Sequence, residues 1–243
     1  IGQPNVGKST LTNHYLTVPL AIESPRPQTT WYAVKGIINH PQGHQIILTD
    51  TPGIHQAIHS QQNQIMNRIA YSAVSQADVI CHLITPKSWS EKDEHVCKVI
   101  RDIPKKKILV INKVDKFNDQ ALFPFIEKAQ QNTCYDEVLS ISAKNGLNCD
   151  LLLDSIAAYL HPQPLGFNRK HIHDHSTAFL AQEMIREQLM QQLKSEMPYT
   201  TLIEVFHTKQ EERRLVIEVN LCVKHIGQKK IIIGHKGQQI KEI

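Results

Sequence analysis

A glycine-rich segment at residues 2–9 constrains the fold of this chain more than any other feature. It reads Gly2-Gln3-Pro4-Asn5-Val6-Gly7-Lys8-Ser9 and matches the pattern G-x-x-x-x-G-K-[ST] at every fixed position. In such a loop the glycines let the backbone curl, so that successive N–H groups point at phosphate oxygens. The helix that follows directs its positive end at the same charge. The segment therefore predicts a strand, a phosphate-binding loop and a helix that begins near Lys8.

Strand-like and helix-like patterns alternate along residues 1–160. The strand-like runs lie at 31–39, 45–50, 79–84, 107–112 and 138–141, and helical patterns lie near 61–75, 90–102, 119–133 and 149–160. This repetition predicts an α/β fold with a mainly parallel sheet, which binds its ligand at the carboxyl ends of the strands. We assign residues 1–160 to this domain and expect its first strand to begin before Ile1.

The composition is that of a globular protein. Hydrophobic residues make up 41% of the chain and charged residues 21%, which excludes a disordered or fibrous chain. No apolar run approaches the roughly 18 residues of a membrane-spanning helix. The five cysteines are odd in number and widely spaced, and none forms a C-x-x-C pair. That pattern favours free thiols in a reducing compartment, so we expect a cytoplasmic location.

A second motif predicts which base is bound. Asn112-Lys113-Val114-Asp115 follows the apolar run 108–111, at the carboxyl end of an expected strand. Guanine presents two adjacent donors, and the carboxylate of Asp115 can accept from both. Adenine has no ring N–H at that place. We expect Asn112 to bridge neighbouring loops and the stem of Lys113 to lie over the base, so the motif predicts guanine nucleotides.

The other site residues are expected at the same edge of the sheet. Lys8 is expected to reach the β- and γ-phosphates, and the Ser9 hydroxyl to bind Mg²⁺. Asp50-Thr51-Pro52-Gly53 follows a strand, so Asp50 would hold the magnesium shell and the Gly53 N–H would contact the γ-phosphate. Ser142-Ala143-Lys144 is expected at the guanine carbonyl. The predicted nucleotide-binding set is Asn5, Val6, Gly7, Lys8, Ser9, Thr10, Asp50, Gly53, Asn112, Lys113, Asp115, Ser142, Ala143 and Lys144.

The order of elements changes after residue 160. Breaker-rich residues 161–166 open a segment that we assign as a linker over 161–175. A long helical pattern follows at 176–195, then two β-rich runs at 200–207 and 215–223. Residues 224–243 carry five lysines and one glutamate, whereas the net charge of the whole chain is +4. On charge alone, a solvated surface explains this basic segment better than a nucleic-acid partner does.

A G-x-x-G loop at residues 234–237 favours a nucleic-acid partner. Two glycines let a nucleic-acid backbone approach closely, and Lys236 adds charge between them. The motif is weak by itself, because a helix–turn–helix connection would look the same. The preceding order of helix, strand, strand and helix strengthens it. The predicted RNA-binding set is Lys229, Lys230, Ile231, Ile233, Gly234, His235, Lys236 and Gly237.

The residues of these motifs resemble those of the Era family of bacterial GTPases. The resemblance rests on residues 2–10, 28–30 and 50–53 in the first half, and on 181–189, 196–199 and 227–237 in the second. It implies a P-loop GTPase domain followed by an α+β type II KH domain at 176–243, whose last helix and strand we expect beyond Ile243. It also implies a GTP-hydrolysing switch that binds small-subunit ribosomal RNA near its 3′ end and assists maturation of the 30S subunit. We expect a monomer, and peripheral association with the inner membrane stays open.

The resemblance also implies catalytic residues, namely Lys8, Thr30, Gly53 and Asn5. Thr30 rather than Thr29 would be the third magnesium ligand, and Asn5 would help to bind K⁺ in the place of an arginine finger. Ile54 stands where a Ras-type enzyme has a glutamine that orients water. An aliphatic side chain cannot hydrogen-bond water, so we expect slow intrinsic hydrolysis.

One departure from the family and three alternative interpretations remain open. Pro25 and Pro27 flank the first switch, and Trp31 stands where the family usually has an arginine, so the conformation of that switch is not predicted. The run His171–His175 could suggest a metal, but we favour a polar approach to the helix at 176. A non-catalytic RNA-binding module that only senses GTP is one rival function. A GTPase whose KH-like half binds protein is the other.

Overall fold

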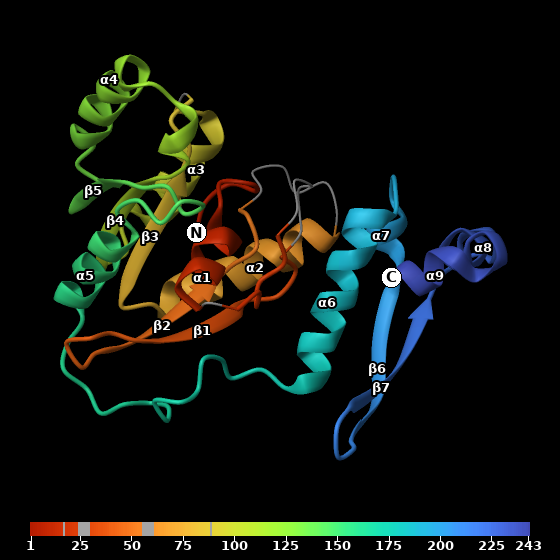
Figure 1. Cartoon of the computed structure of the whole chain (residues 1–243). Coiled ribbons are helices and arrows are strands. Elements are labelled where there is room, and N and C mark those ends of the chain that lie inside the picture. The colour runs from red at the N-terminus through yellow and green to blue at the C-terminus, as the bar shows by residue number, and fades with distance from the viewer. Residues whose placement is uncertain (17, 24–29, 55–60, 88) are drawn as a thin grey trace. The chain divides into compact units, whose positions relative to one another are not determined.

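The computed structural model describes residues 1–16, 18–23, 30–54, 61–87 and 89–243. These residues form two compact units, which we describe separately (Figure 1). Of the described residues, the first unit holds 1–21 and 30–174, and the second holds Ile22, Glu23 and 175–243. The segment predicted as a linker over 161–175 therefore belongs to the first unit as far as Asp174.

A parallel sheet forms the centre of the first unit. It contains β3 (Val79–Ile84), β4 (Lys106–Ile111) and β5 (Glu137–Ser140), with β4 in the middle. Residues 108–111 are completely buried, as expected for a strand that is covered on both faces. Ile1 and Gly2 run alongside β3, since Leu83 N donates to Ile1 O at 2.9 Å and a parallel bridge joins Gly2 to Leu83. This pairing brings the glycine-rich loop to the carboxyl edge of the sheet.

An antiparallel hairpin, β1 (Val34–Asn39) and β2 (Gln45–Asp50), forms a separate two-stranded sheet in this unit. β1 begins three residues later than predicted because β2 ends at Asp50 opposite Val34, which leaves residues 31–33 without a strand partner. Part of the predicted linker runs beside β1. Ile37 N donates to Ile172 O at 2.9 Å, and Gln45 Nε2 donates to Phe167 O at 3.0 Å.

Five α-helices complete the described part of the first unit, and Figure 1 shows them around the strands. They are α1 (Lys8–Leu16), α2 (Gln61–Gln76), α3 (Glu91–Arg101), α4 (Asp119–Gln130) and α5 (Cys149–Tyr159). The main core joins α3 to the parallel sheet through side chains such as Cys97, Ile100, Leu109 and Tyr135. This core fixes the strand ends from which the loops of the site leave.

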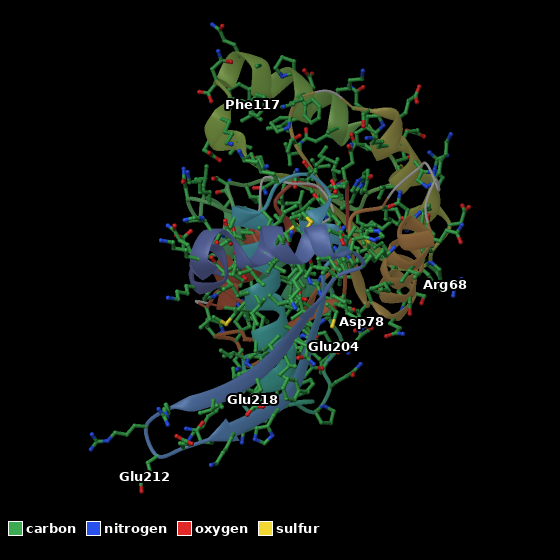
Figure 2. The ribbon with its side chains drawn as sticks, turned by 90° about the vertical axis from the view of Figure 1, so that its right-hand side faces the viewer. Arg68, Asp78, Phe117, Glu204, Glu212 and Glu218 are labelled. Atoms are coloured by element: carbon green, nitrogen blue, oxygen red, sulfur yellow. The ribbon has the colours of Figure 1, made fainter. Side chains whose placement is uncertain are left out.

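The second unit combines helices with one hairpin. Its elements are α6 (Thr177–Gln192), α7 (Met197–Thr200), β6 (Leu202–Gln210), β7 (Leu215–Cys222), α8 (Ile226–Ile233) and α9 (Gln238–Glu242). Its core contains Leu189, Met197, Ile203 and Ile232. Figure 2 shows Glu204 and Glu218 along the β6–β7 hairpin and Glu212 at its tip. Among the residues that the structure describes, no helix is both long and apolar enough to span a bilayer.

Candidate functional site: a guanine-nucleotide pocket

The glycine-rich loop leaves no room for side chains at its two glycines. Gly2 has φ +144° and Gly7 has φ +101°, backbone conformations that residues with a Cβ atom rarely adopt. A Cβ atom at Gly2 would collide with the carbonyl oxygen of Leu83, and one at Gly7 would collide with Nδ2 of Asn112. The loop is therefore packed tightly between β3 and the loop that follows β4.

The ammonium group of Lys8 lies inside the curl of this loop. Its Nζ donates to Gln3 O at 2.9 Å and lies 3.3 Å from Gly2 O. Burial lowers the pKa of Lys8 to about 8, and the nearby carboxylate of Asp50 opposes that shift. A buried positive charge held by carbonyl oxygens is suited to an anionic ligand, because phosphate oxygens are stronger acceptors than carbonyls.

Three oxygen-bearing side chains meet beside Lys8. Ser9 Oγ donates to Asp50 Oδ2 at 2.7 Å and lies 3.2 Å from Thr30 Oγ1. Asp50 is 3% exposed, and its second oxygen, Oδ1, is buried with no hydrogen-bond partner among the described residues. Burial raises the pKa of Asp50, whereas Lys8 and the Ser9 hydrogen bond lower it. An oxygen-only set with an unpaired carboxylate oxygen fits Mg²⁺.

The residue after Gly53 belongs to the core. Ile54 is 1% exposed and packs with Ala70 and Val96, while its N–H is 3.3 Å from Gly2 O. Gly53 lies so close to the loop that a Cβ atom there would be 2.8 Å from Pro4 Cδ. The side chain at position 54 therefore points into the apolar interior and offers no group that could orient water.

Asn112 ties three loops together at the end of β4. Its Nδ2 donates to Val6 O at 2.8 Å, and its Oδ1 accepts from Lys113 N at 2.8 Å and from Ala143 N at 2.9 Å. The side chain is 1% exposed, so these bonds satisfy a polar group that could not otherwise be buried. The bridging role predicted for Asn112 corresponds to this geometry.

The two residues expected at the base lie beside Asn112. Ser142 Oγ donates to Asp115 Oδ1 at 2.6 Å, which positions the carboxylate. Lys113 Nζ donates to Asn5 O at 2.6 Å, so its stem runs from the base-binding loop to the phosphate loop. Burial lowers the pKa of Lys113, and neighbouring Lys116 and Lys87 act in the same direction. Asp115 itself is exposed and accessible to a ligand.

The structure describes some of the remaining predicted residues and not others. Val6 is buried, Thr10 is partly buried at the start of α1, and Lys144 is exposed. Pro25, Pro27 and Thr29 lie outside the described residues. Sequence reasoning missed one contact of this site, in which Gln3 Nε2 donates to Ser90 Oγ at 2.7 Å. Its only signal was the S-x-x-D pattern at residues 90–93, which is typical of a helix start.

The G-x-x-G loop of the second unit connects α8 to α9. Gly234 has φ +71°, and a Cβ atom there would lie 2.9 Å from Gln239 N, so the turn requires glycine. Gly237 has φ +78° with open space around it, and Lys236 between them is exposed. On α8, Ile231 is 52% and Ile233 39% exposed, whereas Ile232 is buried in the core. The remaining members of the predicted RNA set, Lys229, Lys230 and His235, lie on α8 and in the turn that follows it.

The histidine run before α6 has structural contacts. Gly36 and His173 form an antiparallel bridge, and the ring of His175 stacks on Phe179 with centroids 4.4 Å apart. Ser176 Oγ accepts from Phe179 N at 3.2 Å and caps α6. Within the described residues, no group of three His, Cys, Asp or Glu side chains could hold a metal ion. The segment therefore pairs with β1 through His173 and leads into the capped start of α6.

Comparisons with known proteins agree for both halves of the chain. Residues 1–113 match a family model described as 50S ribosome-binding GTPase. The chain is 39% identical over 244 aligned residues to GTPase Era of Pseudomonas aeruginosa, covering 100% of this chain and 80% of that protein.

Two solved structures are similar over nearly the whole chain. One is Era in complex with MgGDPNP and nucleotides 1506–1542 of 16S ribosomal RNA, with a TM-score of 0.92, 35% identity and coverage of 99% of this chain and 82% of that one. The other is a single-residue variant of Aquifex aeolicus Era bound to GDP·AlF4⁻, with a TM-score of 0.92, 35% identity and coverage of 99% and 83%. These likenesses confirm the predicted P-loop GTPase fold.

Proposed function

This chain belongs to the Era family of GTPases, and from that membership we propose how its own residues bind the nucleotide and what its second unit binds. The N–H groups of residues 5–9 and the ammonium of Lys8 hold the phosphates. Asp115 selects guanine, and Ser142, Ala143 and Lys144 lie at the guanine carbonyl. The observation that carries this proposal is the Asn112 side chain, because its hydrogen bonds join the phosphate loop to both base loops.

Three residues of the chain would hold magnesium in this pocket, namely Ser9, Thr30 and Asp50. Their support is the short Ser9–Asp50 hydrogen bond and the unpaired, buried Oδ1 of Asp50. When bound, Mg²⁺ neutralises charge on the β- and γ-phosphate oxygens. Lys8 contributes a second positive charge to the γ-phosphate, and the Gly53 N–H donates to it.

We propose slow intrinsic turnover that depends on potassium. The buried Ile54 supplies no hydrogen bond to an attacking water, so charge neutralisation must supply most of the catalysis. Asn5 would help to hold K⁺ beside the phosphates. Hydrolysis of GTP should therefore be faster in K⁺ than in Na⁺ at equal ionic strength. Equal rates in the two salts would remove Asn5 from the mechanism.

For the second unit we propose binding of single-stranded small-subunit ribosomal RNA near its 3′ end, in support of 30S maturation. The similar Era structure that contains nucleotides 1506–1542 of 16S ribosomal RNA supports this partner. So do the exposed Lys236 and the glycine turn around it. The exposed faces of Ile231 and Ile233 would line the groove for the bases.

Filter binding tests the RNA partner directly. The chain should retain an RNA of the 3′-terminal 16S sequence and release a shuffled RNA of the same composition. A second unit that binds protein instead would retain neither RNA. Turnover of GTP with magnesium, measured with and without that RNA, tests the switch, and no hydrolysis under either condition would favour a chain that only senses GTP.

The remaining family expectations are proposals too. We propose a cytoplasmic monomer that can associate peripherally with the inner membrane, on the resemblance alone. Sedimentation velocity tests the monomer, and cell fractionation with a salt wash tests the location. A chain that stays in the washed membrane fraction, or sediments as a dimer at micromolar concentration, would contradict these proposals.

A further inference from the structure

The phosphate loop of the first unit is attached to the start of helix α3 by a chain of side-chain hydrogen bonds. Gln3, the second residue of the loop, donates from Nε2 to Ser90 Oγ at 2.7 Å. Ser90 Oγ donates in turn to Asp93 Oδ2 at 2.8 Å. Gln3 and Ser90 are 87 positions apart in the sequence, so the contact exists only in the folded unit.

Ser90 and Asp93 form a rigid anchor. Ser90 is the N-cap of α3, where its Oγ accepts from Asp93 N at 3.3 Å, and Asp93 Oδ2 accepts from Ser90 N at 3.1 Å. This reciprocal pair is a capping box, which satisfies two backbone donors at the helix start. Asp93 is only 4% exposed, and α3 packs through Val96, Cys97 and Ile100 into the core. The hydroxyl that Gln3 contacts therefore cannot move without disturbing the helix.

Gln3 links this anchor to the phosphate-binding lysine. Its side chain binds Ser90, and its backbone carbonyl accepts from Lys8 Nζ at 2.9 Å. The side-chain bond thus fixes the peptide that sets the position of the Lys8 ammonium. Gln3 occupies a variable position of the G-x-x-x-x-G-K-[ST] pattern, so the motif itself gives it no role.

We propose that Gln3 and Ser90 are positioning residues for GTP hydrolysis, which hold the phosphate loop in its binding conformation by attaching it to the capping box of α3. In this proposal neither side chain contacts the nucleotide. Each acts through the backbone of the loop and through Lys8. The inference rests on the nucleotide pocket proposed above.

A double-mutant cycle of Gln3→Met and Ser90→Ala in the full chain tests this proposal. Methionine keeps the length of the glutamine side chain but cannot donate a hydrogen bond. Each single variant should lower kcat/KM for GTP by about threefold to tenfold, the effect of losing one neutral hydrogen bond. The double variant should be no worse than Ser90→Ala, because both changes break the same contact. Ser90→Thr keeps the hydroxyl and should restore kcat/KM.

A matched control separates positioning from loss of helix stability. Ser176→Ala removes the N-cap serine of α6 in the second unit, where Ser176 Oγ accepts from Phe179 N. It should lower the melting temperature as Ser90→Ala does, yet leave kcat/KM unchanged. The proposal is overturned if Ser90→Ala and Ser176→Ala behave alike in kinetics, or if the effects of Gln3→Met and Ser90→Ala multiply. A wild-type chain that fails to bind GTP would instead refute the pocket itself.

Discussion

A single buried polar residue, His82, makes the stability of this chain sensitive to pH. His82, in the middle of β3, is completely buried, and its Nδ1 lies 2.6 Å from Tyr135 Oη. Its Nε2 has no hydrogen-bond partner within the described residues, and burial lowers the pKa of His82 to about 3. The imidazole is therefore neutral in the folded chain at neutral pH.

This burial predicts a pH dependence of stability. The pKa of His82 in the folded chain lies below the usual value near 6.5. As the pH falls, the imidazole of the unfolded chain is therefore protonated before that of the folded chain. The contribution of the neutral imidazole to the free energy of unfolding is complete above about pH 6.5 and is lost as the pH falls toward 3. The free energy of unfolding falls by at most about 1.4 kcal/mol per pH unit from this group. Urea unfolding of the wild type and of His82→Phe should show it. The free energy of unfolding of the variant should fall less steeply between about pH 6.5 and pH 4.5, and equal slopes would contradict the burial.

The metal and base residues illustrate what sequence reasoning reaches at this scale. Sequence reasoning could bring Ser9, Asp50 and Asn112 together because it expected their loops at the carboxyl ends of strands in one sheet, although Asp50 in fact ends β2 of the separate hairpin. The Gln3–Ser90 bond could not, because it depends on how α3 packs beside the loop rather than on any local pattern.

At the scale of elements, the glycine loop and helix α8 provide a contrast between two glycines. Gly7 lies against Asn112 with φ +101°, whereas Gly227 near the start of α8 has open space and no positive φ. Gly7→Ala should push apart the phosphate and base loops and weaken GTP binding by more than about tenfold. Gly227→Ala should raise the free energy of unfolding by up to about 1 kcal/mol. Calorimetry and urea unfolding check the pair, and a tight-binding Gly7→Ala chain would contradict this packing.

Apolar runs predicted the central strands well, but element ends and connections depended on tertiary pairing. β3 and β4 lie within one residue of their predicted bounds because their hydrophobic runs have sharp ends. β1 starts late because its partner strand ends, and that register is absent from the local sequence. The breaker-rich segment after residue 160 looked like a free linker, yet Ile172 and Phe167 accept hydrogen bonds from the β1–β2 hairpin. Backbone groups find such partners without any side-chain signature.

At the scale of the whole molecule, a switch requires that nucleotide state and RNA binding influence each other. Coupling of this kind is reciprocal. If the bound nucleotide changes the affinity for RNA by some factor, the bound RNA changes the affinity for that nucleotide by the same factor. The affinity for the 16S 3′-terminal RNA should therefore differ between the chain bound to a GTP analogue and the chain bound to GDP. We expect a factor of about 5 to 150. The same RNA should change the ratio of the affinities for the GTP analogue and for GDP by that factor. A factor of one in both the RNA titration and the nucleotide titration would contradict the switch.

The RNA contact also has a predicted salt dependence. Lys236 is exposed in the G-x-x-G turn, where its charge can replace counterions on the RNA backbone. Lys236→Gln should weaken binding and reduce the slope of log affinity against log salt by about 0.7. Lys128→Gln, a charge loss at an exposed position on α4, is the control and should leave the slope unchanged. An unchanged slope for Lys236→Gln would remove this turn from the RNA interface.

The proposed guanine-nucleotide function requires a single pocket, in which the carboxylate of Asp115 would read the base while the loop at 2–9 would hold the phosphates. Two contacts support it, from Ser142 Oγ to Asp115 Oδ1 and from Lys113 Nζ to Asn5 O. Titration calorimetry of the wild type and Asp115→Asn with the triphosphates of guanosine, adenosine and xanthosine tests it. Xanthine has a carbonyl where guanine has its amino group, so an amide at 115 can donate where the carboxylate accepted. The wild type should prefer GTP, and Asp115→Asn should lose about tenfold to hundredfold in GTP affinity and prefer XTP. A wild type that prefers ATP, or a variant that still prefers GTP, would contradict this pocket.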